Sequence, residues 1–227
     1  MSTSSDLFKL LRLSSQTLPV GAFSYSQGLE WVVDCNQVKT EDDVYRWIQA
    51  MLFGPFSRYE LPLIKRSTAA WSSGNYREII ELNEDYLATR ETHELRSETL
   101  QIGFAFRSVI EDMEIGTDQS LSCLEEMNEL TYPIAFSFCC ASESADIRSV
   151  LSSYAWCFIE NQTIVAMKTI PLGQRAGQRL LTRLIPECEK AIDLAMEIKF
   201  EDWSNFSPLQ AIASSRHEAQ YSRLFRS

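Results

Sequence analysis

Apolar side chains recur at helical spacing along nearly the whole chain, and this pattern restricts the fold more than any other feature. After Thr40, five apolar residues follow at i, i+3, i+4, i+7 and i+8: Val44, Trp47, Ile48, Met51 and Leu52. Such spacing places them on one face of an amphipathic helix. Runs with the period of two that is typical of half-buried strands are almost absent. The sequence therefore predicts an all-α, single compact domain of roughly ten helices.

Two neighbouring segments are predicted to form the core of this domain. Residues 134–141 are apolar on every side, which is typical of a central, buried helix. Residues 146–170 form the longest helical stretch, which Pro171 ends. We therefore expect the segment 133–170 to supply the core pair of helices.

A third long helix is predicted over residues 92–113, with an apolar stripe on one side. Its other side carries Glu91, Glu94 and Glu98, which we interpret as a solvated face. Glu94 and Glu98 are four residues apart and so share that face. A basic group is therefore expected near them to offset their repulsion.

The segment Leu18–Glu30 is predicted to turn sharply and then start a helix. Pro19 and Gly21 favour the turn, and Ser24 with Gln27 fits a capping box. Such a turn is a structural feature and carries no chemistry of its own.

The composition of the chain excludes some classes of function but says little about the fold. The chain has 227 residues and a formal net charge of -10, which argues against nucleic-acid binding. The negative charge suits partners with basic surfaces, or merely aids solubility. No apolar run resembles a signal peptide or a membrane span, so we expect a cytoplasmic protein with six reduced cysteines and no membrane partner.

Catalytic and metal-binding motifs are lacking. His93 and His217 are the only histidines, and neither lies in an HExxH motif; the chain also has no GxSxG motif. We therefore expect that the protein is not an enzyme. Nickel favours imidazole and thiolate ligands, and these are scattered here. A symmetric dimer could still bring two copies of one residue together, and His217 is the one weak metal candidate.

Four stretches, in order, resemble the urease accessory protein family UreF. They are LPVGAFSYSQGLE at residues 18–30, RETHELRS at 90–97, PLGQRAGQ at 171–178 and RHEAQYSRLFRS at 216–227. One such stretch alone would be a weak signal, but the four span nearly the whole chain.

The resemblance implies an all-helical, cytoplasmic homodimer that is not itself a catalyst. It implies binding to the accessory protein UreD (also called UreH), recruitment of the GTPase UreG, and GTP-dependent nickel delivery to apo-urease. No cofactor is expected on this chain alone, because the complex handles the nickel. Two alternatives remain: a GTPase-activating protein that supplies Lys168, Arg175 or Arg179 to UreG, and a free-standing nickel metallochaperone.

The segment from Lys168 to Arg179 is predicted to meet the GTPase. Gly173 and Gly177 either allow another helix to approach closely or are ordinary turn glycines. Lys168 is either a cation favoured at a helix C-terminus or a charge presented to a partner. The predicted interface residues here are Lys168, Gly173, Gln174, Arg175, Gly177, Gln178 and Arg179.

The last residues, 216–227, form a basic stretch that we predict to be a flexible C-terminal tail after a domain of residues 1–215. A terminal tail is often merely frayed, but arginine and aromatic residues are also typical of interfaces. We expect this tail to be disordered alone and to fold onto UreD. Its predicted interface residues are Arg216, His217, Tyr221, Arg223, Leu224, Phe225 and Arg226.

Overall fold

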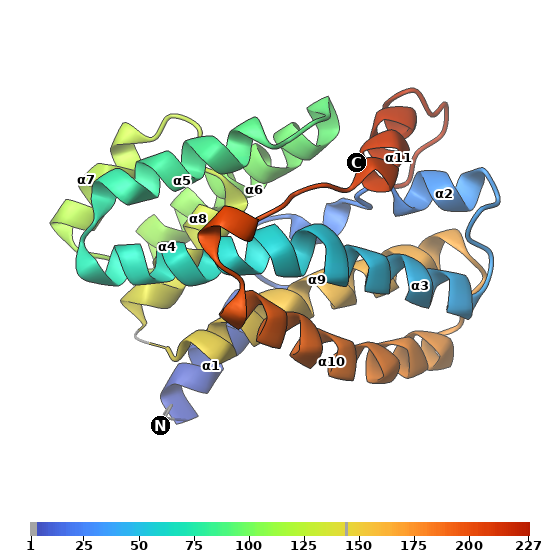
Figure 1. Cartoon of the computed structure of the whole chain (residues 1–227), viewed down its shortest axis with the longest axis horizontal. Coiled ribbons are helices and arrows are strands. Elements are labelled where there is room, and N and C mark those ends of the chain that lie inside the picture. Colours follow the sequence, from blue (N-terminus) through green and yellow to red (C-terminus); the bar gives the residue numbers. More distant parts are fainter. Residues whose placement is uncertain (1–3, 144) are drawn as a thin grey trace.

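The computed structural model describes residues 4–143 and 145–227, and this part of the chain is a helical domain without strands (Figure 1). The prediction of an all-α fold is confirmed. The α-helices are α1 Ser4–Leu13, α2 Leu29–Asp34, α3 Glu41–Met51, α4 Leu61–Ser73, α5 Tyr76–Ala88, α6 His93–Asp112, α7 Asp118–Glu126, α8 Tyr132–Ser142, α9 Ile147–Thr169, α10 Gln174–Glu197 and α11 Pro208–Glu218. No helix among the described residues is both long and apolar enough to cross a bilayer.

Helices α8 and α9 lie in the core, as predicted from their apolar sequences. The α8 side chains from Pro133 to Cys140 are all buried. Both helices pack against α4, and α9 packs in addition along α10. The predicted core pair is therefore part of a larger core in which α4 is a shared neighbour.

Local capping signals fix the starts of two helices where the sequence predicts them. The Thr40 hydroxyl accepts from the Asp43 backbone N–H, and the Asp43 carboxylate accepts from the Thr40 backbone, so α3 begins with a full capping box. The Thr92 side chain caps α6 by accepting from Leu95 N–H.

The chain kinks between α3 and α4 at Gly54, as the Gly54-Pro55 pair in the sequence indicates. Gly54 has a non-helical backbone, with φ -90° and ψ -116°, and wide helical turns over Leu52–Glu60 flank this kink. Pro55 is accommodated within these turns. The widened turns end at Glu60, whose carboxylate points into the interior.

The opening turn also differs from its predicted form. Ser24 and Gln27 make no capping box; α2 starts only at Leu29, after Gly28 with φ 89°. Gln27 has φ 54°, and its side chain donates to Glu98 of α6 instead of to its own helix. The short spacing fitted a local cap, but the partner that Gln27 binds is 71 positions away.

The last residues differ from the prediction of a flexible tail. α11 continues to Glu218, so the boundary predicted after residue 215 falls inside this helix. Residues 219–227, the C-terminal segment, then fold back onto the opening turn, where Arg226 N–H donates to Ser24 O and Ser26 N–H donates to Ser227 O. In Figure 1 the end of the chain lies beside α11.

Candidate functional site

The opening turn, the start of α6, the end of α11 and the C-terminal segment meet at one place in the fold. Helix α9 positions the turn, because Asn161 Nδ2 donates to Tyr25 O at 2.9 Å and Gln162 Nε2 donates to Ser26 O at 3.1 Å. Both side chains are buried, which explains the polar interruption of an otherwise apolar helix. Three of the four stretches that resemble UreF are therefore in contact here.

His217 lies at the centre of this junction, with 0% of its side chain exposed. Its Nδ1 is 2.8 Å from Glu94 Oε2 on α6, and its Nε2 is 3.0 Å from Glu30 Oε2 on α2. The two carboxylates thus flank the imidazole on opposite sides. We call His217, Glu30, Glu94 and Arg223 the His217 cluster.

The His217 cluster also holds the C-terminal segment. The Glu30 carboxylate accepts from the backbone N–H groups of Leu224 at 2.7 Å and Phe225 at 3.0 Å. Arg223 Nη1 donates to Glu94 Oε1 at 2.7 Å. Glu94 is buried, so the interpretation of a solvated face was wrong at this position, while the expected basic partners are present.

Glu98, one helical turn after Glu94, holds the end of the segment. Gln27 Nε2 donates to its Oε1 at 2.7 Å and Ser227 Oγ donates to its Oε2 at 3.0 Å. Burial raises the pKa of Glu98 to about 7, although these hydrogen bonds favour the ionised form. The predicted solvated face was therefore wrong for Glu98 too, and holds only for Glu91, which is exposed.

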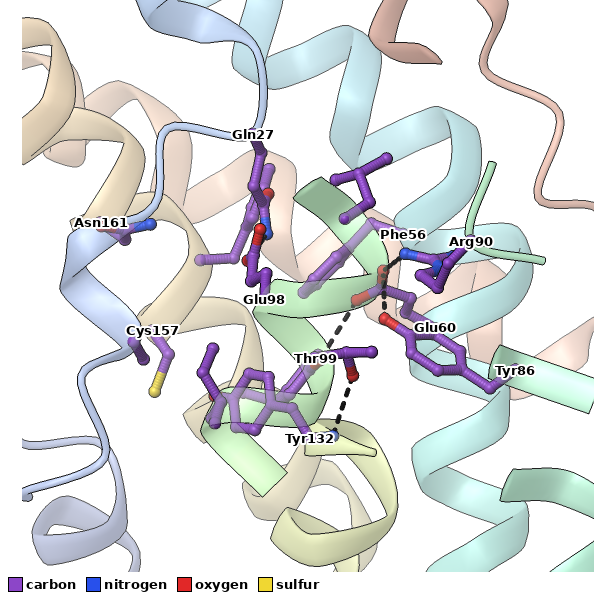
Figure 2. Close-up of a pocket in the computed structure, with 15 residues that line it drawn as sticks. Gln27, Phe56, Glu60, Tyr86, Arg90, Glu98, Thr99, Tyr132, Cys157 and Asn161 are labelled. Atoms are coloured by element: carbon purple, nitrogen blue, oxygen red, sulfur yellow. Dashed lines mark hydrogen bonds and ion pairs between the residues drawn. The ribbon is translucent and has the colours of Figure 1, made fainter. Parts of the chain in front are cut away.

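A small, partly enclosed cavity adjoins Glu98 (Figure 2). On its other side Glu60 accepts from the hydroxyls of Tyr86 and Tyr154, each at 3.1 Å, and from Arg90 Nη1 at 3.4 Å. Burial raises the pKa of both tyrosines well above the usual value, so they remain hydroxyl donors.

The cavity is suited to ordered water. Its volume is about 50 Å³, which is small beside ligand pockets of roughly 300–1,000 Å³ and large enough for one or two water molecules. Arg90 Nε and Asn161 Oδ1 are buried and have no hydrogen-bond partner among the described residues. A water molecule could satisfy such a donor and acceptor.

The C-terminal segment is anchored from inside and exposed outside. Phe225 and Ser227 are buried, whereas Tyr221 is fully exposed and Leu224 is 70% exposed. Arg226 Nη1 reaches Gln101 Oε1 at 3.3 Å but remains on the surface, as does Arg216. The predicted tail residues are thus divided between an anchor, formed by His217 and Phe225, and an outer surface.

The other predicted segment touches this site at one residue. Lys168 Nζ lies 5.4 Å from the centre of the Phe225 ring, a cation–π distance. Gln174, Arg175, Gln178 and Arg179 instead line a shallow surface of α10 together with Glu41 of α3.

The two predicted glycines have different roles. Gly177 lies close to the side chains of Met167 and Thr163 on α9, so it permits a close approach of two helices. Gly173 precedes α10 and has nothing near the position of a Cβ, as expected for an ordinary turn glycine. Each of the alternative interpretations is therefore correct for one of them.

Sequence reasoning missed five residues of the site: Glu30, Glu60, Arg90, Glu94 and Glu98. Glu30, Arg90 and Glu94 lie in the family-like stretches, but no local pattern marks any of the five as buried. Their partners come from remote segments. The one signal in the sequence was that Glu94 and Glu98, four residues apart, required a basic partner that the sequence did not identify.

The structure offers no free imidazole at His217 for a metal ion. Because the ring nitrogens point in opposite directions, Glu30 and Glu94 do not converge with them on one point. Across residues 4–143 and 145–227, no three His, Cys, Asp or Glu side chains are grouped as ligands. Burial also raises the pKa of the Cys139 thiol to about 12, which disfavours the thiolate form that binds metals.

Comparisons with known proteins agree with the four stretches. A family model described as UreF matches residues 38–185. A protein named "Urease accessory protein UreF" from Azoarcus sp. (strain BH72) is 45% identical over 97% of this chain and 95% of its own length. Proteins of the same name from Dechloromonas aromatica (strain RCB) and Janthinobacterium sp. (strain Marseille) are 42% and 37% identical, over 100% and 97% of this chain and 100% and 98% of their own lengths.

Proposed function

Because the chain belongs to the UreF family of urease accessory proteins, we propose that it is a cytoplasmic scaffold on which a urease maturation complex assembles. In this proposal it forms a homodimer, binds UreD (UreH) and recruits the GTPase UreG. Nickel is the cargo of the complex and passes to apo-urease when UreG hydrolyses GTP. The chain itself holds no cofactor.

The architecture of the C-terminal segment carries this proposal. Buried anchors at His217, Phe225 and Ser227 fix the backbone, while Tyr221 and Leu224 project from the surface. A fixed segment presents apolar and cationic side chains to a partner without the full entropy cost of ordering them on binding. Aromatic residues and arginines are enriched in protein interfaces. We assign this outer surface to UreD.

The exposed face at the start of α10 is assigned to UreG. It offers Gln174, Arg175, Gln178 and Arg179, with Lys168 between this face and the C-terminal segment. A GTPase bound there would therefore lie next to a partner that is bound at the segment.

One observation bears on the alternative of a GTPase-activating protein. Arg179 is paired with Glu41 at 2.7 Å and Lys168 lies against Phe225, whereas Arg175 has no ion pair among the described residues. An arginine supplied in trans must be free to reach the nucleotide. If the protein acts in this way, Arg175 is the residue to supply it, and Arg175→Ala should then abolish a stimulation of phosphate release measured with UreG alone.

Co-expression with UreD and UreG, followed by size-exclusion chromatography and a urease assay, tests the scaffold. We expect Tyr221→Ser with Leu224→Ser to leave the helical circular dichroism unchanged but to lose UreD and urease activation. Leu194→Ser is the matched control, because Leu194 is also an exposed leucine, at 46%, but lies on α10. Normal complex formation and activation by the double variant would refute the assignment of this surface.

The metallochaperone alternative is tested on the same preparations. Calorimetric titration of the tag-free chain with nickel should show no tight site, which remains a prediction. Sub-micromolar binding of one nickel per chain would favour the metallochaperone.

A further inference from the structure

We infer that the C-terminal segment is held to the domain by a proton-dependent latch, in which His217 carries a proton on both ring nitrogens while the segment is docked. This inference concerns the free chain and does not depend on which partner the segment meets. The segment comprises residues 219–227, and the latch is the His217 cluster.

When Glu30 and Glu94 are both ionised, the hydrogen-bond geometry requires two protons on the His217 ring. Ionised carboxylate oxygens only accept, and a neutral imidazole has a single N–H. Nδ1 and Nε2 of His217 lie 2.8 Å from Glu94 and 3.0 Å from Glu30. A neutral ring would therefore direct a lone pair at a carboxylate oxygen on one side or the other. Only the imidazolium donates on both sides.

The charge balance of the cluster leads to the same conclusion. Glu30 and Glu94 contribute two buried negative charges, and Arg223 contributes one positive charge from its rim. With an imidazolium the cluster is neutral. Without the second proton, one negative charge is left uncompensated in the interior, which is strongly unfavourable.

The other charged groups around His217 do not replace this proton. On α11, Arg216 is exposed, and Glu218 accepts the Glu94 backbone N–H at 3.2 Å. On α9, Lys168 faces the Phe225 ring instead of a carboxylate. Glu98 on α6 binds Gln27 and Ser227, so it acts at the far end of the segment.

Loss of the proton affects the segment directly, because the groups that hold His217 also hold the segment backbone. Glu30 accepts from the N–H groups of Leu224 and Phe225, and Glu94 binds Arg223. If these carboxylates turn outward to be solvated, the segment keeps only the Phe225 contacts and its few bonds to the opening turn and to Glu98. We therefore expect it to open as pH rises.

Hydrogen exchange of the full chain, followed by mass spectrometry over a pH series and corrected for the intrinsic exchange rate, measures the opening. The opening constant of residues 219–227 should rise by up to about tenfold per pH unit, the slope for release of one proton. The amides of α8, which are far from the latch, should show no such slope. A flat profile for residues 219–227 would overturn the proposal.

Substitutions separate His217 from the other titrating groups. His217→Gln should open the segment at every pH and remove the slope. His93→Gln should retain it, because His93 lies on the surface beside Ser97. Glu98→Gln removes the titration of the carboxyl group that bonds Ser227, so the slope that remains in this variant belongs to His217. An unchanged slope in His217→Gln would exclude the latch.

A spectroscopic measurement on the folded protein makes the conclusion independent of that variant's folding. The chain has two histidines, so His93→Gln leaves His217 as the only imidazole. Its two ¹⁵N chemical shifts should report protons on both nitrogens wherever the segment is protected from exchange. A singly protonated ring in the protected state would contradict the inference.

Discussion

At the scale of single residues, the environment of each carboxylate on α6 decides its chemistry. Glu91, Glu94 and Glu98 follow one another within two helical turns, yet one is solvated, one is ion-paired and one is buried with neutral donors. The sequence predicts their shared helix and the need for a basic group nearby. It could not identify that group, because His217 is 123 positions from Glu94 along the chain.

Glu98 should make the stability of the protein depend on pH. Its pKa is about 7 in the folded chain, against 4.5 for an ordinary glutamate, so the folded state binds the proton more tightly. The contribution of Glu98 to the free energy of unfolding is therefore complete below pH 4.5, and it is lost as the pH rises through about 7. Such a shift corresponds to roughly 3 kcal/mol.

Glu98→Gln tests this, because glutamine cannot ionise. Relative to the wild type, the variant should gain roughly 3 kcal/mol of unfolding free energy between pH 4.5 and pH 8. Urea unfolding of both proteins at each pH gives the difference and cancels the other titrating groups. A stability difference that does not vary with pH would show that Glu98 titrates normally.

At the scale of elements, helices that begin with a local signal match the prediction, and those that depend on remote contacts do not. Thr40 and Thr92 cap α3 and α6 at the positions where the sequence predicts these helices to start, because each cap and the N–H that it accepts from lie within one turn. The opening turn and α11 differ, since Gln27 and His217 bind side chains from other helices. The spacing of apolar residues along the chain gives no information about such contacts.

Replacing either of two helical glycines by alanine should change the stability of the protein by very different amounts. A Cβ at Gly103 of α6 would overlap the backbone carbonyl of Leu130, whereas one at Gly177 of α10 would meet the flexible end of Met167. Gly103→Ala should therefore destabilise by about 3 kcal/mol. Gly177→Ala should stay within about 1 kcal/mol of the wild type, because alanine favours the helix.

Thermal and urea unfolding of the two variants measure this contrast. Both replace glycine by the same residue inside a helix, so each is a control for the helix propensity of the other. Equal stabilities would mean that the approach of α6 to Leu130 is not tight.

At the scale of the whole molecule, the negative charge is confined to one part of the chain. Residues 76–129 carry 14 Asp or Glu and four Lys or Arg, which equals the entire net charge of -10. The rest carries 17 of each kind. Eleven of these 14 acidic residues belong to α5, α6 and α7, which lie together in Figure 1, and the other three lie in the loops that follow them. Composition alone predicts the charge but not that it is gathered on three neighbouring helices.

This distribution of charge restricts which surface can form the interface of the proposed homodimer. In a two-fold dimer a face meets its own copy, so an acidic face would meet like charge. We expect the dimer to avoid the exposed side of α7. Glu125→Lys with Glu126→Lys should then leave the mass by analytical ultracentrifugation unchanged. A change in the association state would place the interface on this helix.

The contact between the opening turn and the C-terminal segment also bears on how the protein is synthesised. Glu30 leaves the ribosome early, but its partners Leu224 and Phe225 are made 194 and 195 residues later. Until then Glu30 has neither His217 nor the segment backbone, although helices between them can already pack. Contacts between residues so far apart in the sequence cost a large loop-closure entropy, so they form late in folding. A nascent chain would therefore have a core before it has this junction, and the surface that we propose for UreD would form only after residues 219–227 had left the ribosome.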